Sequence, residues 1–224
     1  MRMKLFKKLF GGLKTPTSTM GTSPSIHLLI AEPTVTPGAC ADTRFGGTPS
    51  VNEGFAWPTC KGCASPLQFL GQIRPTGAQH LHLIFMCDEN PGECGQWEAD
   101  GGANAVVCVP VNDLHVAALP SAGQVTRGTG YGARVEPTQA VDYTQAHNAF
   151  SGRRRDVLGQ LGGAPSWLQA EQTPSCNHCN APMRFVAQLE PGPDHTTEMN
   201  FAGGCAYLFE CDCSGVSAKF LWQC

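Results

Sequence analysis

The residues best suited to chemistry are cysteines, of which this chain of 224 residues has twelve. Two C-x2-C pairs occur, and each is followed along the chain by a second pair. A C-x2-C turn presents two thiolates on one side, and a pair from a neighbouring strand completes the tetrahedral set that zinc prefers. We therefore predict two zinc ions, one bound by Cys60, Cys63, Cys87 and Cys94, and the other by Cys176, Cys179, Cys211 and Cys213.

The second set is less regular than the first, because a single residue separates Cys211 from Cys213. Cys205, Cys224 or His178 are alternative fourth ligands. Four thiolates around a divalent ion leave a charge of about −2, so an adjacent acid such as Asp88 or Asp212 should point away. A zinc ion wrapped by four thiolates has no open position, so we expect structural sites and no catalytic residues.

Other cysteine chemistry explains the spacing less well. Disulfides would account for an even number of cysteines, but they do not predict C-x2-C pairs at a fixed offset. A thioredoxin-like dithiol would open a helix, whereas these pairs precede strand patterns. The remaining cysteines are expected to be small buried hydrophobic residues: Cys40, Cys108, Cys205 and Cys224.

Motifs of common enzyme classes are missing from the sequence. It has no HExxH, GxSxG, P-loop or dinucleotide fingerprint. His80 and His82 share one face of a predicted strand and could bind a metal, although a surface position is the ordinary expectation. Glu53, Gln72 and Gln188 are the other polar residues of interest, and a glutamine in a strand usually makes core hydrogen bonds. An enzyme would have to use Glu53 or an unpaired cysteine.

An internal repeat organises the chain. The segment 46–75 matches the segment 162–191 at eleven positions in one register of 116 residues, including both C-x2-C pairs and the motif GG-x-P-S. Further along, IFMCD at 84–88 matches LFECD at 208–212 with an offset of 124. The chain is therefore predicted to contain two copies of one module.

The elements of each copy are mostly strands. Apolar or alternating runs at 26–31, 67–73, 80–87, 105–110, 183–189, 205–211 and 218–224 predict strands, and helical periodicity occurs only within 138–161. We predict an α+β fold, predominantly β, with two zinc-stabilised β-rich modules in one compact unit. Its parts are a basic segment and linker at 1–24, a first module at 25–111, a partly helical connector at 112–161 and a second module at 162–224.

Charge is unevenly distributed along the chain. Five of the fifteen Lys and Arg residues lie in the first fourteen residues, which leaves ten bases against eighteen acids, a net charge of about −8, in the remainder. This acidic body argues against nucleic acid and favours a basic protein partner. Residues 1–14 are amphipathic enough to lie on a membrane surface, but Gly11 and Gly12 break the helix after two turns, so a frayed or docked terminus is favoured over membrane contact. The segment also lacks the pattern of a secretory signal, so a cytoplasmic location is expected.

Several of these motifs resemble known families. FGGTPSVNEGFAWPTC, PLQFLGQI, GGCAYLFECD and AKFLWQC resemble the YwqG-like family of mainly bacterial proteins. LGGAPSWLQ, CNHCNAPMRFVAQLEP and YLFEC are similar to the duplicated cysteine-rich modules of the programmed cell death protein 2 family. The resemblance covers about residues 45–224 and leaves 112–156 unmatched. Resemblance to the programmed cell death protein 2 family implies a chaperone for a basic ribosomal protein. Resemblance to the YwqG-like family, some of whose members neighbour toxin genes, implies an immunity protein.

Together these features predict a cytoplasmic, non-enzymatic, zinc-stabilised protein-binding module, chaperone-like toward a basic client. The chain lacks the longer insert and the additional zinc-binding segment of the second family, so the client's identity does not carry over. The alternatives are an immunity protein that neutralises a toxin and a small-molecule enzyme. Trp57, Trp167 and Gln169 are candidate partner contacts, although packing onto the zinc modules would also explain them.

Overall fold

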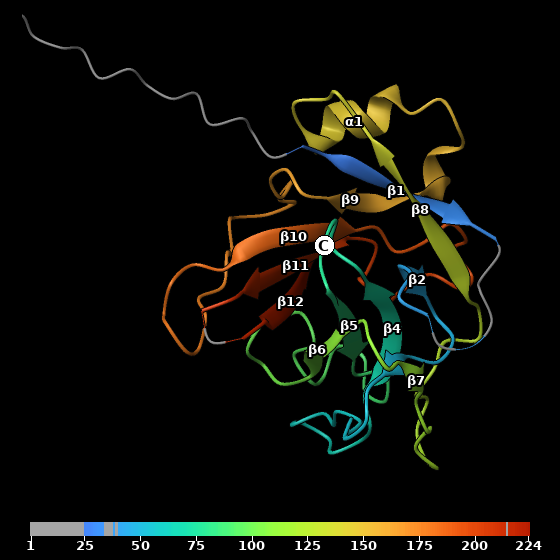
Figure 1. The fold of residues 1–224 in the computed structure, drawn as a ribbon, viewed down its shortest axis with the longest axis vertical. Coiled ribbons are helices and arrows are strands. Elements are labelled where there is room, and N and C mark those ends of the chain that lie inside the picture. Colours follow the sequence, from blue (N-terminus) through green and yellow to red (C-terminus); the bar gives the residue numbers. More distant parts are fainter. Residues whose placement is uncertain (1–24, 34–37, 39, 214) are drawn as a thin grey trace, which may run out of the picture.

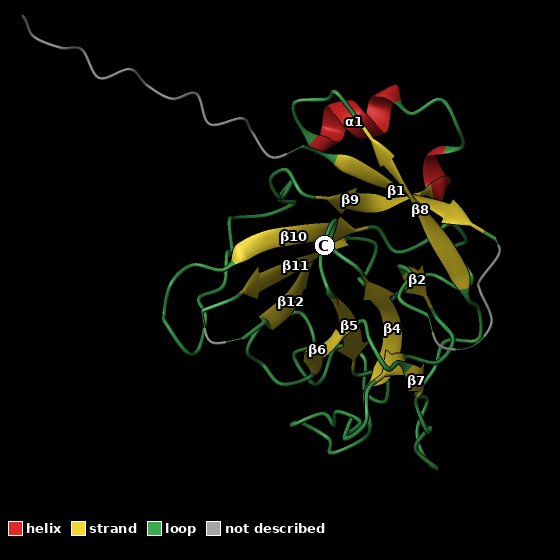
Figure 2. Ribbon diagram, in the orientation of Figure 1, coloured by secondary structure: helices red, strands yellow, loops and turns green. Residues whose placement is uncertain are grey.

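The computed structural model describes residues 25–33, 38, 40–213 and 215–224. The predicted N-terminal segment 1–24, to which the question of membrane contact belongs, lies outside the described residues. Among those residues the chain is predominantly β, which confirms this part of the expected fold class, and it has one α-helix (Figure 2). The strands are β1 His27–Glu32, β2 Arg44–Phe45, β3 Ser50–Val51, β4 Gln68–Ile73, β5 His80–Met86, β6 Asn104–Pro110, β7 His115–Val116, β8 Tyr131–Pro137, β9 Val157–Leu161, β10 Arg184–Leu189, β11 Cys205–Cys211 and β12 Ser217–Gln223. The helices are α1 Tyr143–Ala149 and the 3-10 turn Arg154–Asp156.

Ten of the strands form one antiparallel sheet in the order β12-β11-β10-β9-β1-β8-β2-β4-β5-β6 (Figure 1). The sheet curls into a near-barrel, so that its two edge strands, β6 and β12, approach each other. The backbone N–H of Trp222 donates to the carbonyl of Trp97 at 3.3 Å where the two edges meet. The remaining strands, β3 and β7, pair with each other, and Val51 of β3 belongs to the same buried cluster as Phe69 of β4 and Phe85 of β5.

The strand order is symmetric about its centre, between β1 and β8. β2, β4, β5 and β6 of the first copy correspond to β9, β10, β11 and β12 of the second. The first strand of each copy is exchanged: β1 is the first strand of the first copy in sequence but pairs with β9, and β8 is the first strand of the second copy but pairs with β2. The predicted connector 112–161 therefore contains two strands of the shared sheet, β8 and β9.

Local irregularities repeat with the sequence. The pairing register shifts between Phe69 and Gly71 in β4 and between Phe185 and Ala187 in β10, 116 residues later. Both glycine pairs of the GG-x-P-S motifs have φ near +70°. A Cβ at Gly46 would lie 2.0 Å from the carbonyl oxygen of Thr129, just before β8, and one at Gly162 would lie 2.6 Å from that of Ser25, just before β1. The glycines thus permit the close approach of the exchanged strands.

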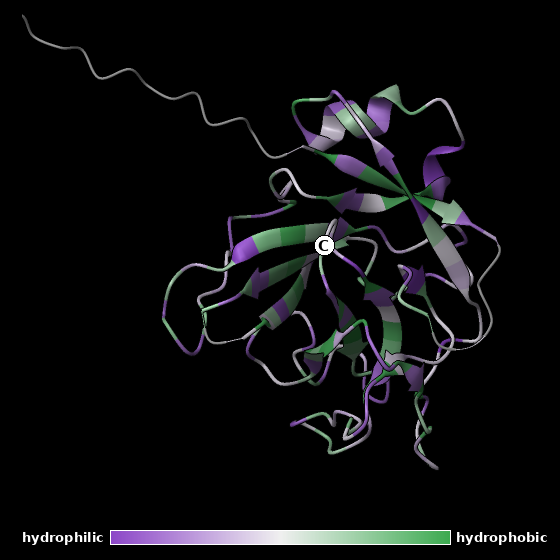
Figure 3. Ribbon diagram, in the orientation of Figure 1, coloured by the Kyte–Doolittle hydropathy of each residue, from purple (hydrophilic) through white to green (hydrophobic). Residues whose placement is uncertain are grey.

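The core follows from the alternation of side chains along each strand. On β5, Ile84 and Met86 face the barrel interior, where they pack with Leu208 of β11 and with apolar residues of both copies. Phe85 of β5 and Phe209 of β11 face outward and contribute to two separate clusters, each beside one set of four cysteines. Hydrophobic residues accordingly concentrate on the strands in Figure 3.

Helix α1 is shorter than the stretch with helical periodicity. Asp142 caps it by accepting the N–H of Gln145 at 2.7 Å, and Tyr143 packs with the outer residues of β1. Residues 157–161 form β9 instead, because their apolar side chains are buried between β1 and β10 and Gly159 has a φ of +127° that disfavours a helix. Within the described residues, no helix combines the length and the hydropathy needed to span a membrane.

Candidate metal centres

Each C-x2-C pair lies in a tight hairpin turn of the same construction. The N–H of Cys60 donates to Ser65 O at 2.8 Å, and the N–H of Cys176 donates to Ala181 O at 2.9 Å. The residue after each pair, Ala64 or Asn180, has φ near +60°. Because these positions are 116 residues apart, the repeated sequence produces the same turn twice, with both thiols on one side.

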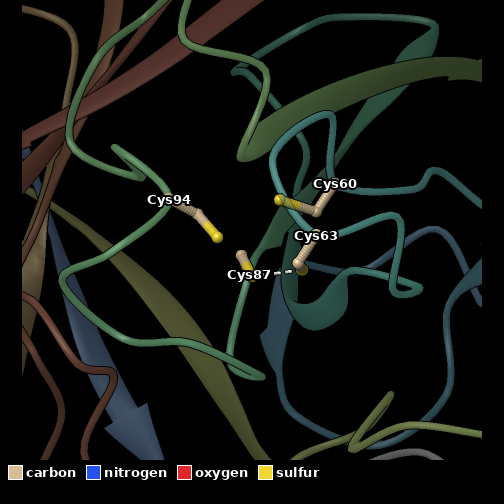
Figure 4. Close-up of side chains that lie close together, drawn as sticks. All are labelled: Cys60, Cys63, Cys87 and Cys94. Atoms are coloured by element: carbon tan, nitrogen blue, oxygen red, sulfur yellow. Dashed lines mark hydrogen bonds between the residues drawn. The ribbon is translucent and has the colours of Figure 1, made fainter.

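The first cysteine set is assembled from three segments. Cys60 and Cys63 come from the turn, Cys87 directly follows β5, and Cys94 lies in the loop that leads to β6 (Figure 4). All four Sγ atoms lie within 4.8 Å of one another. The Sγ atoms of Cys63 and Cys87 are 3.7 Å apart. Tetrahedral zinc with Zn–S bonds of about 2.3 Å requires sulfurs about 3.8 Å apart, whereas a disulfide requires about 2.05 Å.

The second set has the same arrangement around Cys176 and Cys179. Cys211 ends β11 and Cys213 follows it, and Sγ–Sγ distances of 3.7 Å join Cys176 to Cys213 and Cys179 to Cys211. The alternative ligands considered from sequence lie outside the group of four. Cys205 is buried, with its Sγ 3.1 Å from the hydroxyl of Tyr207, and Cys224 is exposed.

Backbone N–H groups favour the thiolate form at both turns. The amide of Ser65 lowers the pKa of Cys63 to about 6. The amides of Cys179 and His178 lower the pKa of Cys176 to about 6, and the His178 N–H lies 3.4 Å from its sulfur. Burial acts in the opposite direction and raises the pKa of Cys94 to about 12. These amides are donors of the kind that stabilise thiolate ligands around a metal.

Neighbouring acids and solvent distinguish the two sets. Gln68 Nε2 donates to Asp88 Oδ2 at 3.0 Å, which fixes this carboxylate, and Asp212 is exposed. In the first set two cysteines are buried and two are half-buried, whereas Cys179 and Cys213 of the second set are exposed. The second set is therefore the more accessible to solvent and chelators.

Two of the three predicted partner-contact residues, Trp57 and Trp167, pack in the outer clusters that contain the cysteines. Trp57 packs edge-on against Phe85 at 5.4 Å, and its Nε1–H donates to Leu67 O at 2.8 Å. Trp167 packs on Tyr207 with ring centroids 4.4 Å apart. Both tryptophans are half-buried. Trp57 packs in the outer cluster that contains the first cysteine set, and Trp167 packs in the outer cluster that contains Cys176 and Cys211. Gln169 is exposed, and its Nε2 donates to the carbonyl of Cys224 at 2.6 Å.

The two repeated glutamines hold the GG-x-P-S loops. Gln72 Oε1 accepts the N–H of Ser50 at 3.2 Å, and Gln188 Oε1 accepts the N–H of Ser166 at 2.8 Å. Gln72 Nε2 also donates to the carbonyls of Cys40 and Asp42. Both are buried in the sheet, so their contacts are those of core hydrogen-bonding residues. Glu53 is exposed on a loop.

A third group of side chains was only partly indicated by the sequence. His80 and His82 of β5 meet Glu210 of β11, whose Oε2 lies 3.1 and 3.0 Å from their Nε2 atoms. Burial, together with the charge of Arg184, lowers the pKa of His80, and burial, followed by His80 and Arg184, lowers that of His82 to about 3. Glu210 lies 130 residues after His80 in the sequence. The sequence signal that could have identified it is the repeat, in which this glutamate takes the place of the apolar Met86.

The chain was compared with protein-family models and with curated proteins. No protein-family model matches the chain, and no curated protein matches it. Function is therefore inferred from the residues and their geometry. Two sets of four cysteines could each hold a metal ion, and the presence of two sets suggests two modules.

Proposed function

We propose that the chain is a zinc-stabilised protein-binding module that captures a basic segment of another protein, in the manner of a chaperone. The observation that carries the proposal is the pair of four-cysteine centres. A zinc ion held by four thiolates has no position for water or substrate, so its contribution is to fold the surrounding loops. The ligands must also stay reduced, which suits the cytoplasm.

The seam between β6 and β12 is the binding surface that the fold favours. Within the sheet each of these strands pairs on one side only, with β5 and β11 respectively. Apart from the Trp222 N–H, which donates to Trp97 O, the outer backbone groups of the two strands face the seam, and strand addition by a peptide would use them. A cleft of about 410 Å³ lies at the seam and includes parts of both metal-bearing modules, among them Lys61, Asp100 and Asn177. An extended peptide would therefore contact both copies at once.

The charge of the chain supports a basic partner. Residues 25–224 carry ten bases against eighteen acids. At the seam, Lys219 Nζ forms an ion pair with Asp100, 2.7 Å away, and donates to Asn177 Oδ1, while the side chain of Asp100 is 62% exposed. The similarity of the CNHCNAPMRFVAQLEP segment to the programmed cell death protein 2 family is consistent with this proposal.

The test uses the full chain with two equivalents of Zn²⁺ and a fluorescein-labelled peptide of alternating Lys and Val. We expect binding that weakens with added salt, and no binding of the matching peptide of Glu and Val. Asp100→Lys at the seam should weaken binding, whereas the control Glu53→Lys makes the same change in net charge on a distant exposed loop and should not. Equal binding by the two variants would place the partner elsewhere, and equal binding of both peptides would refute a basic client.

A further inference from the structure

The third group of side chains lies at one end of the barrel interior and shares no residue with the two sets of cysteines, although Glu210 directly precedes Cys211 in the chain. His80 and His82 alternate with outward residues on β5 and therefore face inward with Ile84. Glu210 faces inward from β11 on the opposite wall. One atom of each residue lies within 4.8 Å of the other two, so three potential ligand atoms converge from two strands that are not neighbours in the sheet.

The buried imidazole of His82 is not satisfied by the protein. The side chain is fully buried, and neither of its ring nitrogens makes a hydrogen bond of acceptable geometry. Its Nε2 lies 3.0 Å from Glu210 Oε2, which is close enough for a hydrogen bond but is off the direction of the ring N–H. A buried polar atom without a partner destabilises the fold unless something else binds it. His82 Nε2 and Glu210 Oε2 are thus close together without being aligned for a hydrogen bond, which is the arrangement expected of two ligand atoms that bind the same metal ion.

The repeat shows that the barrel does not need this group. With the offset of 124 residues, Glu210 corresponds to Met86, His82 to Ala206 and His80 to Gly204. Met86 and Ala206 are ordinary members of the interior cluster. The same fold therefore packs one end with apolar residues and places two histidines and a carboxylate at the other.

The group is also reachable from solvent. His80 and Glu210 line a cavity of about 480 Å³, together with His27, Thr76, Gly77 and Arg184. Arg184 bonds to Glu210 Oε1, which leaves Oε2 directed to the histidines. The Arg184 side chain is 69% exposed, so it lies at the solvent side of the group.

We propose that His80, His82 and Glu210 bind a third metal ion, a divalent transition metal such as Zn²⁺, with an open position toward the cavity. Two imidazoles and one carboxylate are a ligand set that such ions accept, and three protein ligands leave a fourth position for water or an anion. Arg184 would position an anionic ligand there. This site would differ from the four-cysteine centres because its ion could exchange and could contact a ligand, and it does not depend on the proposed partner.

Native mass spectrometry of the full chain, loaded with two equivalents of Zn²⁺ and then titrated with more, tests the proposal. We expect a third bound ion. His80→Asn should lower the affinity for this third ion by more than the roughly 10- to 100-fold that follows from loss of a residue that only hydrogen-bonds a ligand. The first two ions should be retained. The control His27→Asn replaces a histidine of the same cavity that lies outside the group, and should keep the third ion.

Co²⁺ added to the zinc-loaded chain provides an independent readout. Binding at the proposed site should produce weak d–d bands without the intense sulfur-to-cobalt charge-transfer band that thiolate ligands produce. Glu210→Gln, which preserves the shape of the side chain, should remove these bands while circular dichroism shows the fold intact. A wild-type chain that stops at two ions, a third ion that survives both variants, or a thiolate spectrum would each overturn the proposal.

Discussion

Gln72 shows how one side chain can hold a whole loop in place. It is fully buried, and its two polar atoms together bond to three backbone groups of the segment that precedes β4, those of Cys40, Asp42 and Ser50. Buried backbone groups need partners, and no water can replace this amide inside the sheet. Gln188 repeats the contact to its own loop through Ser166.

Gln72→Leu preserves the approximate volume of the side chain but leaves Ser50 N–H and two carbonyls without their partner. We expect the free energy of unfolding to fall by about 2 kcal/mol or more, measured by urea denaturation with zinc present. Gln124→Leu is the matched control because Gln124 is exposed, and it should change stability by less than about 0.5 kcal/mol. Equal effects of the two substitutions would contradict the structural role of Gln72.

The cysteine at 213 tests the less regular ligand set. Cys213→Ser should leave the second centre with three thiolates, so the proposed zinc should be lost there and retained at the first centre. Native mass spectrometry should show the mass fall by one zinc, and the thermal midpoint should fall with it. Cys224→Ser changes an exposed cysteine outside both sets and should retain two ions. Retention of two ions by Cys213→Ser would favour a different fourth ligand.

The cysteine sets were predictable from sequence because their geometry is largely local. The turns at Cys60–Cys63 and Cys176–Cys179 are specified by a few residues, and the repeat indicated which later cysteines join them. Glu210 was not predictable in the same way, because β5 and β11 meet only when the barrel closes.

Helix α1 is fastened to the sheet by a buried hydrogen bond. The hydroxyl of Tyr143 donates to Glu190 Oε1 at 2.8 Å, just beyond the end of β10. Burial raises the pKa of Glu190, while the Tyr143 bond opposes this effect. The helix therefore docks beside a carboxylate that folding makes harder to ionise.

This raised pKa has a consequence for stability. Between the ordinary and the raised pKa, the folded chain binds more protons than the unfolded chain, so stability falls as the pH rises through that window. Glu190→Gln keeps the acceptor for Tyr143 and removes the charge. We expect the variant to match the wild type below the ordinary carboxyl pKa and to be the more stable above the window, as measured by thermal unfolding against pH. A variant that loses stability at neutral pH would show that the charged form is favoured.

Strands were easier to predict than the helix for a physical reason. The runs that became β4, β5, β10 and β11 have apolar residues at strand spacing and follow or precede cysteines in each copy. Residues 157–161 resemble the end of a helix in sequence, but burial between two strands outweighs that local preference. Strand exchange between the copies was not predictable, because similar sequences do not specify which copy provides a partner strand.

The exchanged strands bind the two copies into one folding unit. β1 belongs to the first copy in sequence and pairs with β9, while β8 belongs to the second and pairs with β2. The interior cluster also combines residues of both copies, among them Phe45 and Leu70 with Val186 and Phe220. Either copy alone would expose this apolar surface and lose the partner of its second strand.

A break in the exposed loop between Ser121 and Ala122 separates the copies without cutting a strand. We expect fragments 1–121 and 122–224 each to lack cooperative unfolding in the presence of zinc, because each lacks one exchanged strand and half of the core. Mixing them should restore the circular dichroism spectrum and the cooperative transition of the intact chain, since β1 can then join β9 and β8 can join β2. The control is a mixture in which Leu29 of β1 is replaced by Asp, which puts a charge into the shared core and should prevent recovery. If fragment 1–121 unfolded cooperatively alone with the stability of the intact chain, the copies would be independent domains and the exchange would be incidental to folding.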